Sequence, residues 1–201
     1  MIQYPSIPSV ARCRGLGKPC IAFYKYDGSN LRFEWSPKRN WHKFGSRTQL
    51  IDQNTEQFKG AIPLFMDTMS KDIVEIIRDE FGSKALRIVA FAEYYGPSSF
   101  AGFHDPNEPK QLKLFDVSVY KQGFLPAKQF VELFGDKEWS AEVEYTGNLN
   151  QPFINDVRHG AYPVYEGVVC KGVGWNAKIK TFEYLNRLKH QFDDEWEKYA
   201  E

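Results

Sequence analysis

The sequence predicts an α+β fold in which mainly antiparallel sheets are flanked by helices. Strand-like and helix-like segments alternate irregularly, and several connections have hairpin character, which favours this class over a doubly wound parallel sheet. The 201 residues, 42% of them hydrophobic, suffice for one good core. No linker or internal repeat divides the chain, so we expect residues 1–201 to form a single domain.

The first strand-like segments surround an Asp-Gly pair. Residues 20–26 and 30–35 are rich in aromatic and branched side chains, which favours strands. Asp27 and Gly28 lie between them, and Asp-Gly is a strong signal for a two-residue hairpin turn. The sequence therefore predicts that these two strands pair with each other.

The middle of the chain predicts a helix, two strands and a loop. Four apolar residues share one helical face: Ile73, Ile76, Ile77 and Phe81. Ser70 is the expected cap of this helix and Gly82 its end. Residues 86–94 and 112–120 are apolar strands, and residues 97–111 form a long loop rich in Pro, Gly and Ser.

The last third predicts two helices and a strand pair. Pro126 begins a short helix that ends at Gly135. Residues 164–171 and 175–181 form paired strands joined by Gly-Val-Gly. A charged helix follows over residues 182–200, with an apolar packing face made by Tyr184, Leu185, Leu188, Phe192 and Trp196.

Charge is distributed unevenly although the net charge is zero. Residues 1–48 hold nine basic and two acidic residues, a net charge of +7, so the remainder carries −7. Such asymmetry fits a localised phosphate-binding face, and it also fits chance clustering on a solvated surface.

Cysteine content and hydropathy indicate the cellular setting. Cys13, Cys20 and Cys170 are far apart and odd in number, which fits neither a disulfide framework nor a zinc knuckle. No apolar run approaches the roughly 20 residues that span a bilayer. The N-terminus has no secretory signal pattern. We therefore expect a cytoplasmic protein without a membrane partner.

The stretch Lys25-Tyr26-Asp27-Gly28-Ser29-Asn30 places a lysine two residues before an Asp-Gly pair. Five further motifs follow it in order: Ser46-Arg47-Thr48, Phe91 to Gly96, Phe115-Asp116-Val117, Glu166 to Lys171, and Lys178-Ile179-Lys180. In this order the set resembles the covalent nucleotidyltransferase superfamily of polynucleotide ligases and mRNA capping enzymes. Within it, the chain looks most like the phage-type ATP-dependent RNA ligases.

The resemblance implies a nucleophilic lysine. In similar ligases the first-motif lysine, here Lys25, takes AMP from ATP as a covalent lysyl-AMP. An amine attacks only when neutral, and its ordinary pKa is about 10.4, so nearby cations or a bound metal are needed to disfavour the charged form. Lys178 and Lys180 alternate with Ile179 and so face one side of a strand, where both can reach one phosphate.

A carboxylate and a fourth lysine lie in the preceding strand. Strand alternation predicts that Glu166 shares a face with Val168 and Cys170, and that Lys171 lies on the opposite face. By resemblance, Glu166 is the ligand for Mg²⁺ or Mn²⁺, and Lys171 contacts the nucleotide. A carboxylate suits such hard cations.

The remaining motif residues are expected to hold the nucleoside. By resemblance, Glu93 and Arg47 contact the ribose and Phe115 stacks on adenine. Asp27 and Gly28 shape the nucleotide-binding turn, because glycine lets the backbone approach a ligand.

RNA is the acceptor that the resemblance favours. Asn30 replaces the arginine that is usual in capping enzymes and many DNA ligases, and the Ser99–His104 loop also looks more like the RNA ligases. The predicted nucleic-acid face is a basic segment with interleaved aromatic residues: Trp35, Lys38, Arg39, Trp41, Lys43 and Phe44.

The resulting expectation is an RNA-repair ligase that joins 5′-phosphate and 3′-hydroxyl RNA ends in the cytoplasm, or in a host cytoplasm if phage-encoded. Its ATP-grasp-like nucleotidyltransferase core has no C-terminal OB-fold, so an accessory protein or domain in trans is a further expectation. Two alternatives stay open: a minimal ATP-dependent DNA ligase, and a non-catalytic nucleotide- or end-binding module.

Overall fold

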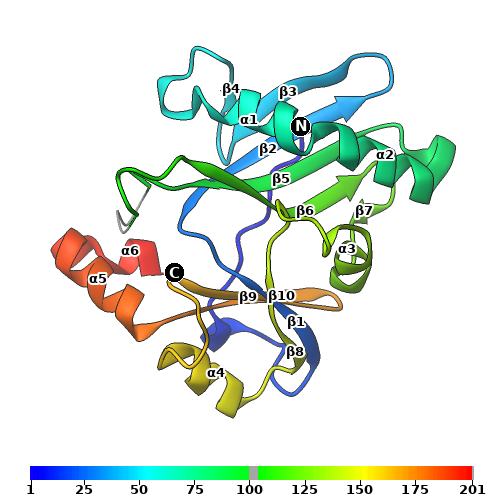
Figure 1. Ribbon diagram of the computed structural model, residues 1–201. Helices are drawn as coiled ribbons and strands as arrows, with labels where there is room; N and C mark the ends of the chain where they lie inside the picture. Colours follow the sequence, from blue (N-terminus) through cyan, green and yellow to red (C-terminus); the bar gives the residue numbers. More distant parts are fainter. Residues whose placement is uncertain (100–103, 201) are drawn as a thin grey trace. The chain divides into compact units, whose positions relative to one another are not determined.

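The computed structural model describes residues 1–99 and 104–200 (Figure 1). Their contacts divide the chain into two compact units. The six-stranded unit comprises residues 1–4, 28–99 and 104–140, and the four-stranded unit comprises residues 5–27 and 141–200. Each sheet is antiparallel throughout, as the sequence predicts for the fold class.

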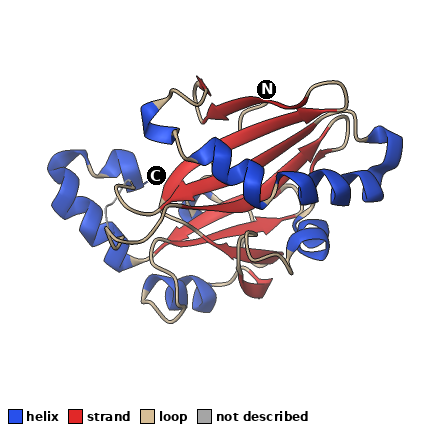
Figure 2. Ribbon diagram, turned by 45° about the horizontal axis from the view of Figure 1, so that its top comes forward, coloured by secondary structure: helices blue, strands red, loops and turns tan. Residues whose placement is uncertain are grey.

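The larger sheet has the strand order β4-β3-β2-β5-β6-β7. Its strands are β2 (Gly28–Ser36), β3 (Asn40–Ser46), β4 (Leu50–Ile51), β5 (Ile88–Tyr95), β6 (Gln111–Val119) and β7 (Gly123–Phe124). The unit also contains the helices α1 (Ala61–Thr68), α2 (Ser70–Phe81) and α3 (Ala127–Phe134) and two 3-10 turns, Glu56–Phe58 and Gly82–Lys84. Figures 1 and 2 show α1 and α2 running across one face of this sheet.

Aromatic packing joins these helices to the sheet. The Phe33 ring stacks on the Phe65 ring of α1 at 3.8 Å, and the Trp41 ring meets Phe65 edge-on at 4.7 Å. Ile73 and Ile77 of α2 are fully buried, as their helical spacing predicts. These contacts form the core on one side of the sheet.

Residues 1–4 belong to this unit and contact its opposite face. The Arg32 guanidinium donates to the Ile2 carbonyl at 2.9 Å, and the Tyr4 hydroxyl donates to Asp116 at 2.9 Å. Both Arg32 and Asp116 are buried, so the N-terminal residues satisfy polar groups that water does not reach.

The smaller sheet has the strand order β10-β9-β1-β8. Its strands are β1 (Pro19–Tyr24), β8 (Val143–Asn148), β9 (Gly167–Gly172) and β10 (Trp175–Lys180). The helices of this unit are α4 (Gln151–Arg158), α5 (Phe182–Phe192) and α6 (Glu197–Ala200), with 3-10 turns at Val10–Arg12 and Asp193–Glu195. One sheet face packs against α4 through Ala22, Val168, Cys170, Phe153 and Val157.

The predicted hairpin around Asp27 and Gly28 is wrong. The two strands exist as β1 and β2, but β1 pairs with β8 and β9, whereas β2 pairs with β3 and β5. Asp27 and Gly28 therefore connect two different sheets. Pairing with strands that are distant in sequence outweighs the local turn preference.

Several other predictions are confirmed. The β9–β10 pair, the strands β5 and β6 and the short helix α3 all lie within a few residues of their predicted bounds. Helix α2 does begin at Ser70 and end before Gly82, but Ser70 is not its cap. The Ser70 hydroxyl instead donates to the Met66 carbonyl at 2.8 Å. The helices α1 and α4 and the strands β3 and β8 were not predicted.

The predictions for the long loop, the cysteines and membrane-spanning segments can be compared with the described residues. Residues 100–103, within the loop predicted over residues 97–111, lie outside the described residues. All three cysteines are free thiols. Among the helices that the structure describes, none combines the length and apolar character needed to cross a bilayer.

The aromatic part of the predicted nucleic-acid face is wrong. Trp35 is buried, and the Trp41 indole nitrogen donates to the Ser70 carbonyl at 3.1 Å while its ring packs on Phe65. The Phe44 ring lies 6.0 Å from Phe33. Trp35 and Trp41 are therefore not free to stack on bases, whereas Phe44 is half-buried. Lys38, Arg39 and Lys43 are exposed.

Candidate functional site

Lysines gather on one face of the four-stranded sheet. In β9, Gly167 and Val169 pair with Lys180 and Lys178 of β10, and Val169 also pairs with Phe23 of β1. Register partners in an antiparallel sheet point to the same face. The Lys25 amide continues this ladder by donating to the Gly167 carbonyl at 2.9 Å. We call this surface the lysine face; its cations are Lys25, Lys171, Lys178 and Lys180.

Two of these lysines share one carboxylate. The Lys25 ammonium lies 2.7 Å from Oε2 of Glu166, and the Lys180 ammonium lies 3.3 Å from Oε1 of the same residue. The Glu166 side chain is 4% exposed and that of Lys180 is 8% exposed, whereas Lys25 retains 23% exposure. The most accessible member of this cluster is therefore the predicted nucleophile.

The predicted orientation of Glu166 is wrong. Val168 and Cys170 do point into the core, but Glu166 joins the lysine face. Strand β9 begins at Gly167, whose φ is +141°, a conformation that breaks the alternation expected from a continuous strand. Gly167 thus turns the carboxylate towards Lys25 and Lys180.

Gly167→Ala is expected to destabilise the protein by about 3 kcal/mol, because the positive φ disfavours a side chain and the new Cβ collides with the Ile179 carbonyl oxygen. Urea unfolding measures this loss. Gly174→Ala is the matched control: its φ is +75° but nothing lies within 4 Å of the added atom, so we expect a loss of only about 1 kcal/mol. Equal losses for the two variants would contradict the close approach at Gly167.

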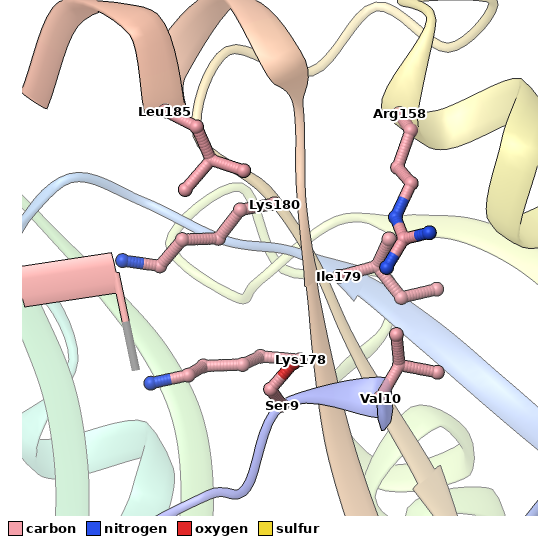
Figure 3. A pocket seen from close by; sticks show the side chains of 7 residues that line it. All are labelled: Ser9, Val10, Arg158, Lys178, Ile179, Lys180 and Leu185. Atoms are coloured by element: carbon pink, nitrogen blue, oxygen red, sulfur yellow. The ribbon is translucent and has the colours of Figure 1, made fainter. Parts of the chain in front are cut away.

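Lys178 and Lys180 extend in parallel from β10, as their spacing predicts. Figure 3 shows both ammonium groups pointing to the same side, while the Arg158 guanidinium lies on the other side of the strand near Ile179. These residues, with Ser9, Val10 and Leu185, line a cavity of about 50 Å³. The two amines therefore point away from Arg158, and their predicted role in phosphate binding stays a prediction.

Burial lowers the pKa of Lys180. Desolvation is the largest cause; the Glu166 carboxylate opposes it, and the Lys25 charge adds to it. Lys180 therefore gives up its proton more readily than an exposed lysine does.

The lowered pKa of Lys180 makes stability depend on pH. Between this lowered pKa and the ordinary value of 10.5, the unfolded chain binds more protons than the folded protein, so stability rises with pH. Lys180→Met should flatten this rise by at most about 1.4 kcal/mol per pH unit. Urea unfolding of both proteins from about pH 7.5 to about pH 9.5 tests it, below the range in which tyrosines ionise. A steeper rise in the variant would contradict this sign.

Asp27 and Tyr184 form a buried pair beside this cluster. The Tyr184 hydroxyl donates to Oδ1 of Asp27 at 2.9 Å, and the Lys180 ammonium lies 5.1 Å from the Tyr184 ring centre. Burial raises the pKa of Tyr184, and the charges of Glu166 and Asp27 raise it further, so the phenol keeps its proton. The sequence placed Tyr184 only on a packing face, because nothing local signals a partner 157 residues away.

Lys171 occupies the lysine face at a different point. It pairs with Ile21 and Asn176, and its ammonium lies 5.1 Å from the Phe23 ring centre. The side chain is buried, with the cation against an aromatic face.

Glu93 and Asn30 are direct partners in the six-stranded unit. They face each other across β5 and β2, and Lys113 of β6 pairs with Glu93 on its other side. Glu93 is half-buried. Two motifs that are 63 positions apart in sequence therefore meet in one sheet.

Phe115, Arg47 and Gly28 also belong to the six-stranded unit. Phe115 lies at a bulge in β6, and its ring meets that of Tyr4 edge-on at 5.0 Å. Arg47 follows β3 and is exposed. Gly28 begins β2, where an added Cβ would lie 2.5 Å from the Tyr94 carbonyl oxygen, so glycine is required there by space. Their assignment to a nucleoside stays a prediction.

The described residues could bind a metal ion only if a substrate supplied further ligands. Within the described part of the chain, no group of three or more His, Cys, Asp or Glu side chains could hold an ion. Glu166 offers one carboxylate that already has two cationic partners. Mg²⁺-type ions are commonly held by one or two carboxylates together with phosphate oxygens and water, and Glu166 fits that arrangement.

Comparison with known proteins bears on the fold. The sequence matches no protein-family model and no curated protein. Solved structures of the Naegleria gruberi RNA ligase are similar: one with PPi has a TM-score of 0.69 at 16% identity and is matched over 94% of this chain. A variant with ATP and Mn gives 0.66 at 16%, and a variant with AMP and Mn gives 0.67 at 14%, each over 92% of this chain.

This chain spans 58% of the length of those RNA ligase chains. The similarity covers both antiparallel sheets, since it includes more than nine-tenths of the residues here. The predicted α+β fold with antiparallel sheets flanked by helices is therefore confirmed, and it is similar to the fold of these RNA ligase structures.

Proposed function

We propose that this chain is an ATP-dependent RNA ligase that joins 5′-phosphate and 3′-hydroxyl RNA ends through a lysyl-AMP intermediate. One observation carries the proposal: Lys25, Lys180 and Glu166 are ion-paired on the lysine face of a chain with an RNA ligase fold. Pure nucleotide binding does not require a partly exposed lysine set against a buried carboxylate.

The first proposed step is the transfer of AMP to Lys25. Its Nζ attacks the α-phosphorus of ATP, an N–P bond forms, and the bond from the α-phosphorus to the bridging oxygen breaks as pyrophosphate leaves. The Lys25 ammonium group gives up two of its three protons to water in the process, and the nitrogen of the lysyl-AMP keeps the third. Lys178 and Lys180 point to one side of β10 and supply positive charge for the phosphate oxygens.

Glu166 holds the reacting groups in place. Its carboxylate contacts the Lys25 and Lys180 ammonium groups, so it fixes the separation of nucleophile and phosphate-binding cation. In the proposed complex Glu166 is also the protein ligand for a divalent cation, Mg²⁺ or Mn²⁺. Such an ion, when bound, neutralises charge on the transferring phosphoryl group.

Two further transfers complete the proposed reaction. An oxygen of the RNA 5′-phosphate attacks the lysyl-AMP phosphorus, which breaks the N–P bond and leaves AMP on the RNA end. The 3′-hydroxyl then attacks the 5′-phosphorus of the RNA and AMP departs. Glu93, Arg47 and Phe115 are the proposed contacts to the nucleoside, Asp27, Gly28 and Lys171 are the other proposed nucleotide contacts, and an accessory protein or domain acting in trans is part of the proposal.

The test combines ATP labelled at the α-phosphate with a set of 5′-phosphorylated substrates. We expect the protein to acquire label with Mg²⁺ or Mn²⁺ and to join nicked duplexes or single strands that carry RNA at the 3′-hydroxyl side. Parallel substrates with DNA at that side measure the acceptor preference. The proposed role is repair of broken RNA in the cytoplasm.

Each alternative has its own outcome in this assay. Sealing of DNA nicks with no joining of RNA ends would identify a minimal DNA ligase. ATP binding without covalent label would identify a nucleotide-binding module and overturn the proposal.

A further inference from the structure

Tyr184 contacts two of the predicted site residues through different parts of its side chain. Its hydroxyl donates to Asp27 at 2.9 Å, and its ring lies 5.1 Å from the Lys180 ammonium. The residue is 1% exposed and packs edge-on against Tyr165, with ring centres 5.6 Å apart. Its position is therefore set by packing and does not depend on solvent.

The first turn of α5 ties Tyr184 to the segment that carries Glu166. The Tyr184 amide donates to Oγ1 of Thr181 at 3.1 Å, and this hydroxyl donates to the Tyr165 carbonyl at 2.7 Å. The Thr181 amide donates to the Glu166 carbonyl at 3.0 Å. A movement of α5 would therefore displace both Tyr184 and the main chain at Glu166.

Asp27 links this helix to the predicted nucleophile. It lies two residues after Lys25, and it is 5% exposed. A buried carboxylate requires hydrogen-bond donors from the protein, and Tyr184 supplies one of them. The Lys25 main chain is held at the other end of the same segment by the Gly167 carbonyl.

We propose that Tyr184 is a positioning residue for adenylylation: by holding Asp27, it fixes the segment from Lys25 to Asp27 so that the Lys25 amine stays aligned with Glu166 and Lys180. The assignment rests on the proposed function. The proposal means that α5 contributes to the first chemical step through Tyr184, which was predicted only as part of the apolar packing face of that helix.

Tyr184→Phe tests the assignment because it keeps the ring and removes only the hydroxyl. At saturating ATP, we expect the rate of AMP transfer to fall about 10-fold to 100-fold, since small misplacements of a nucleophile are costly. The KM for ATP should stay within about twofold of wild type. Tyr145→Phe is the matched control: it removes a hydroxyl that donates to the Asn148 carbonyl at 3.1 Å in the same unit, and it should react at the wild-type rate.

A double-mutant cycle separates positioning through Asp27 from general packing. In an Asp27→Asn background, adding Tyr184→Phe should cost less than about twofold more, because the interaction it removes is already weakened. A purely structural role would make the two effects multiply. Thermal unfolding of every variant confirms that folded proteins are compared.

A wild-type rate for Tyr184→Phe, or an undiminished effect in the Asp27→Asn background, would overturn the assignment alone. Failure of the wild-type protein to acquire label would overturn the proposed function as well. The two failures are therefore distinguishable in one set of reactions.

Discussion

Lys25→Met is expected to abolish transfer of AMP from ATP to the protein, with a loss of about a thousandfold or more. The proposed covalent bond forms at the Lys25 amine, and no other group in the ion-paired cluster has its exposure. Label from ATP that stays with the denatured protein on a gel measures the transfer.

Two control variants separate chemistry from folding. Lys25→Arg keeps a cation beside Glu166, so it should fold normally, yet it should also take no label because a guanidinium stays protonated. Lys18→Met is the same change, lysine to methionine, at an exposed residue of the same unit. This variant should acquire label from ATP like the wild type. Substantial labelling of Lys25→Met would show that another residue accepts AMP.

Glu166→Gln should have the second largest effect, lowering the rate of AMP transfer by about 100-fold or more. It removes the proposed metal ligand and leaves two ammonium groups without their shared carboxylate. The free energy of unfolding should also fall, by about 2 kcal/mol. This lies below the range for a fully buried pair because Lys25 is partly exposed.

The stability loss in Glu166→Gln should shrink as pH rises. Without the Glu166 carboxylate, which opposes the effect of burial, the pKa of Lys180 falls further, so the stability of the variant rises more steeply with pH than that of the wild type. Urea unfolding at neutral and alkaline pH measures this. The matched control is Glu183→Gln, an exposed position in the first turn of α5, which should change neither stability nor AMP transfer. Full activity in Glu166→Gln would remove Glu166 from the mechanism.

Local sequence patterns predict where the helices and strands of this fold lie better than they predict which strands pair with each other. The helical spacing of Ile73 and Ile77 and the Gly-Val-Gly turn between β9 and β10 are local signals, and both predictions are confirmed. The Asp27-Gly28 signal fails because β1 and β2 each find partners far away in sequence. Trp35 was expected at a surface, but it is buried, and the ring of its strand partner Trp41 packs on Phe65 of α1.

The candidate site shows the same division. Alternation correctly places Lys178 and Lys180 on one side of β10, because that strand is regular. It fails at Glu166, which precedes the strand, because the strand begins only at Gly167, whose φ is positive. The bond from Tyr184 to Asp27 has no sequence signal at all, since it depends on how α5 packs in the four-stranded unit.

The most direct test of the account is the identification of the AMP-bearing residue in the wild-type protein. The protein is incubated with ATP and Mg²⁺ or Mn²⁺, its intact mass is measured, and proteolytic peptides are sequenced by mass spectrometry at neutral pH. The account predicts a gain of one AMP per chain, joined to Lys25 by an acid-labile bond. A protein whose mass is unchanged, or an adduct on another residue such as Lys178, would contradict it.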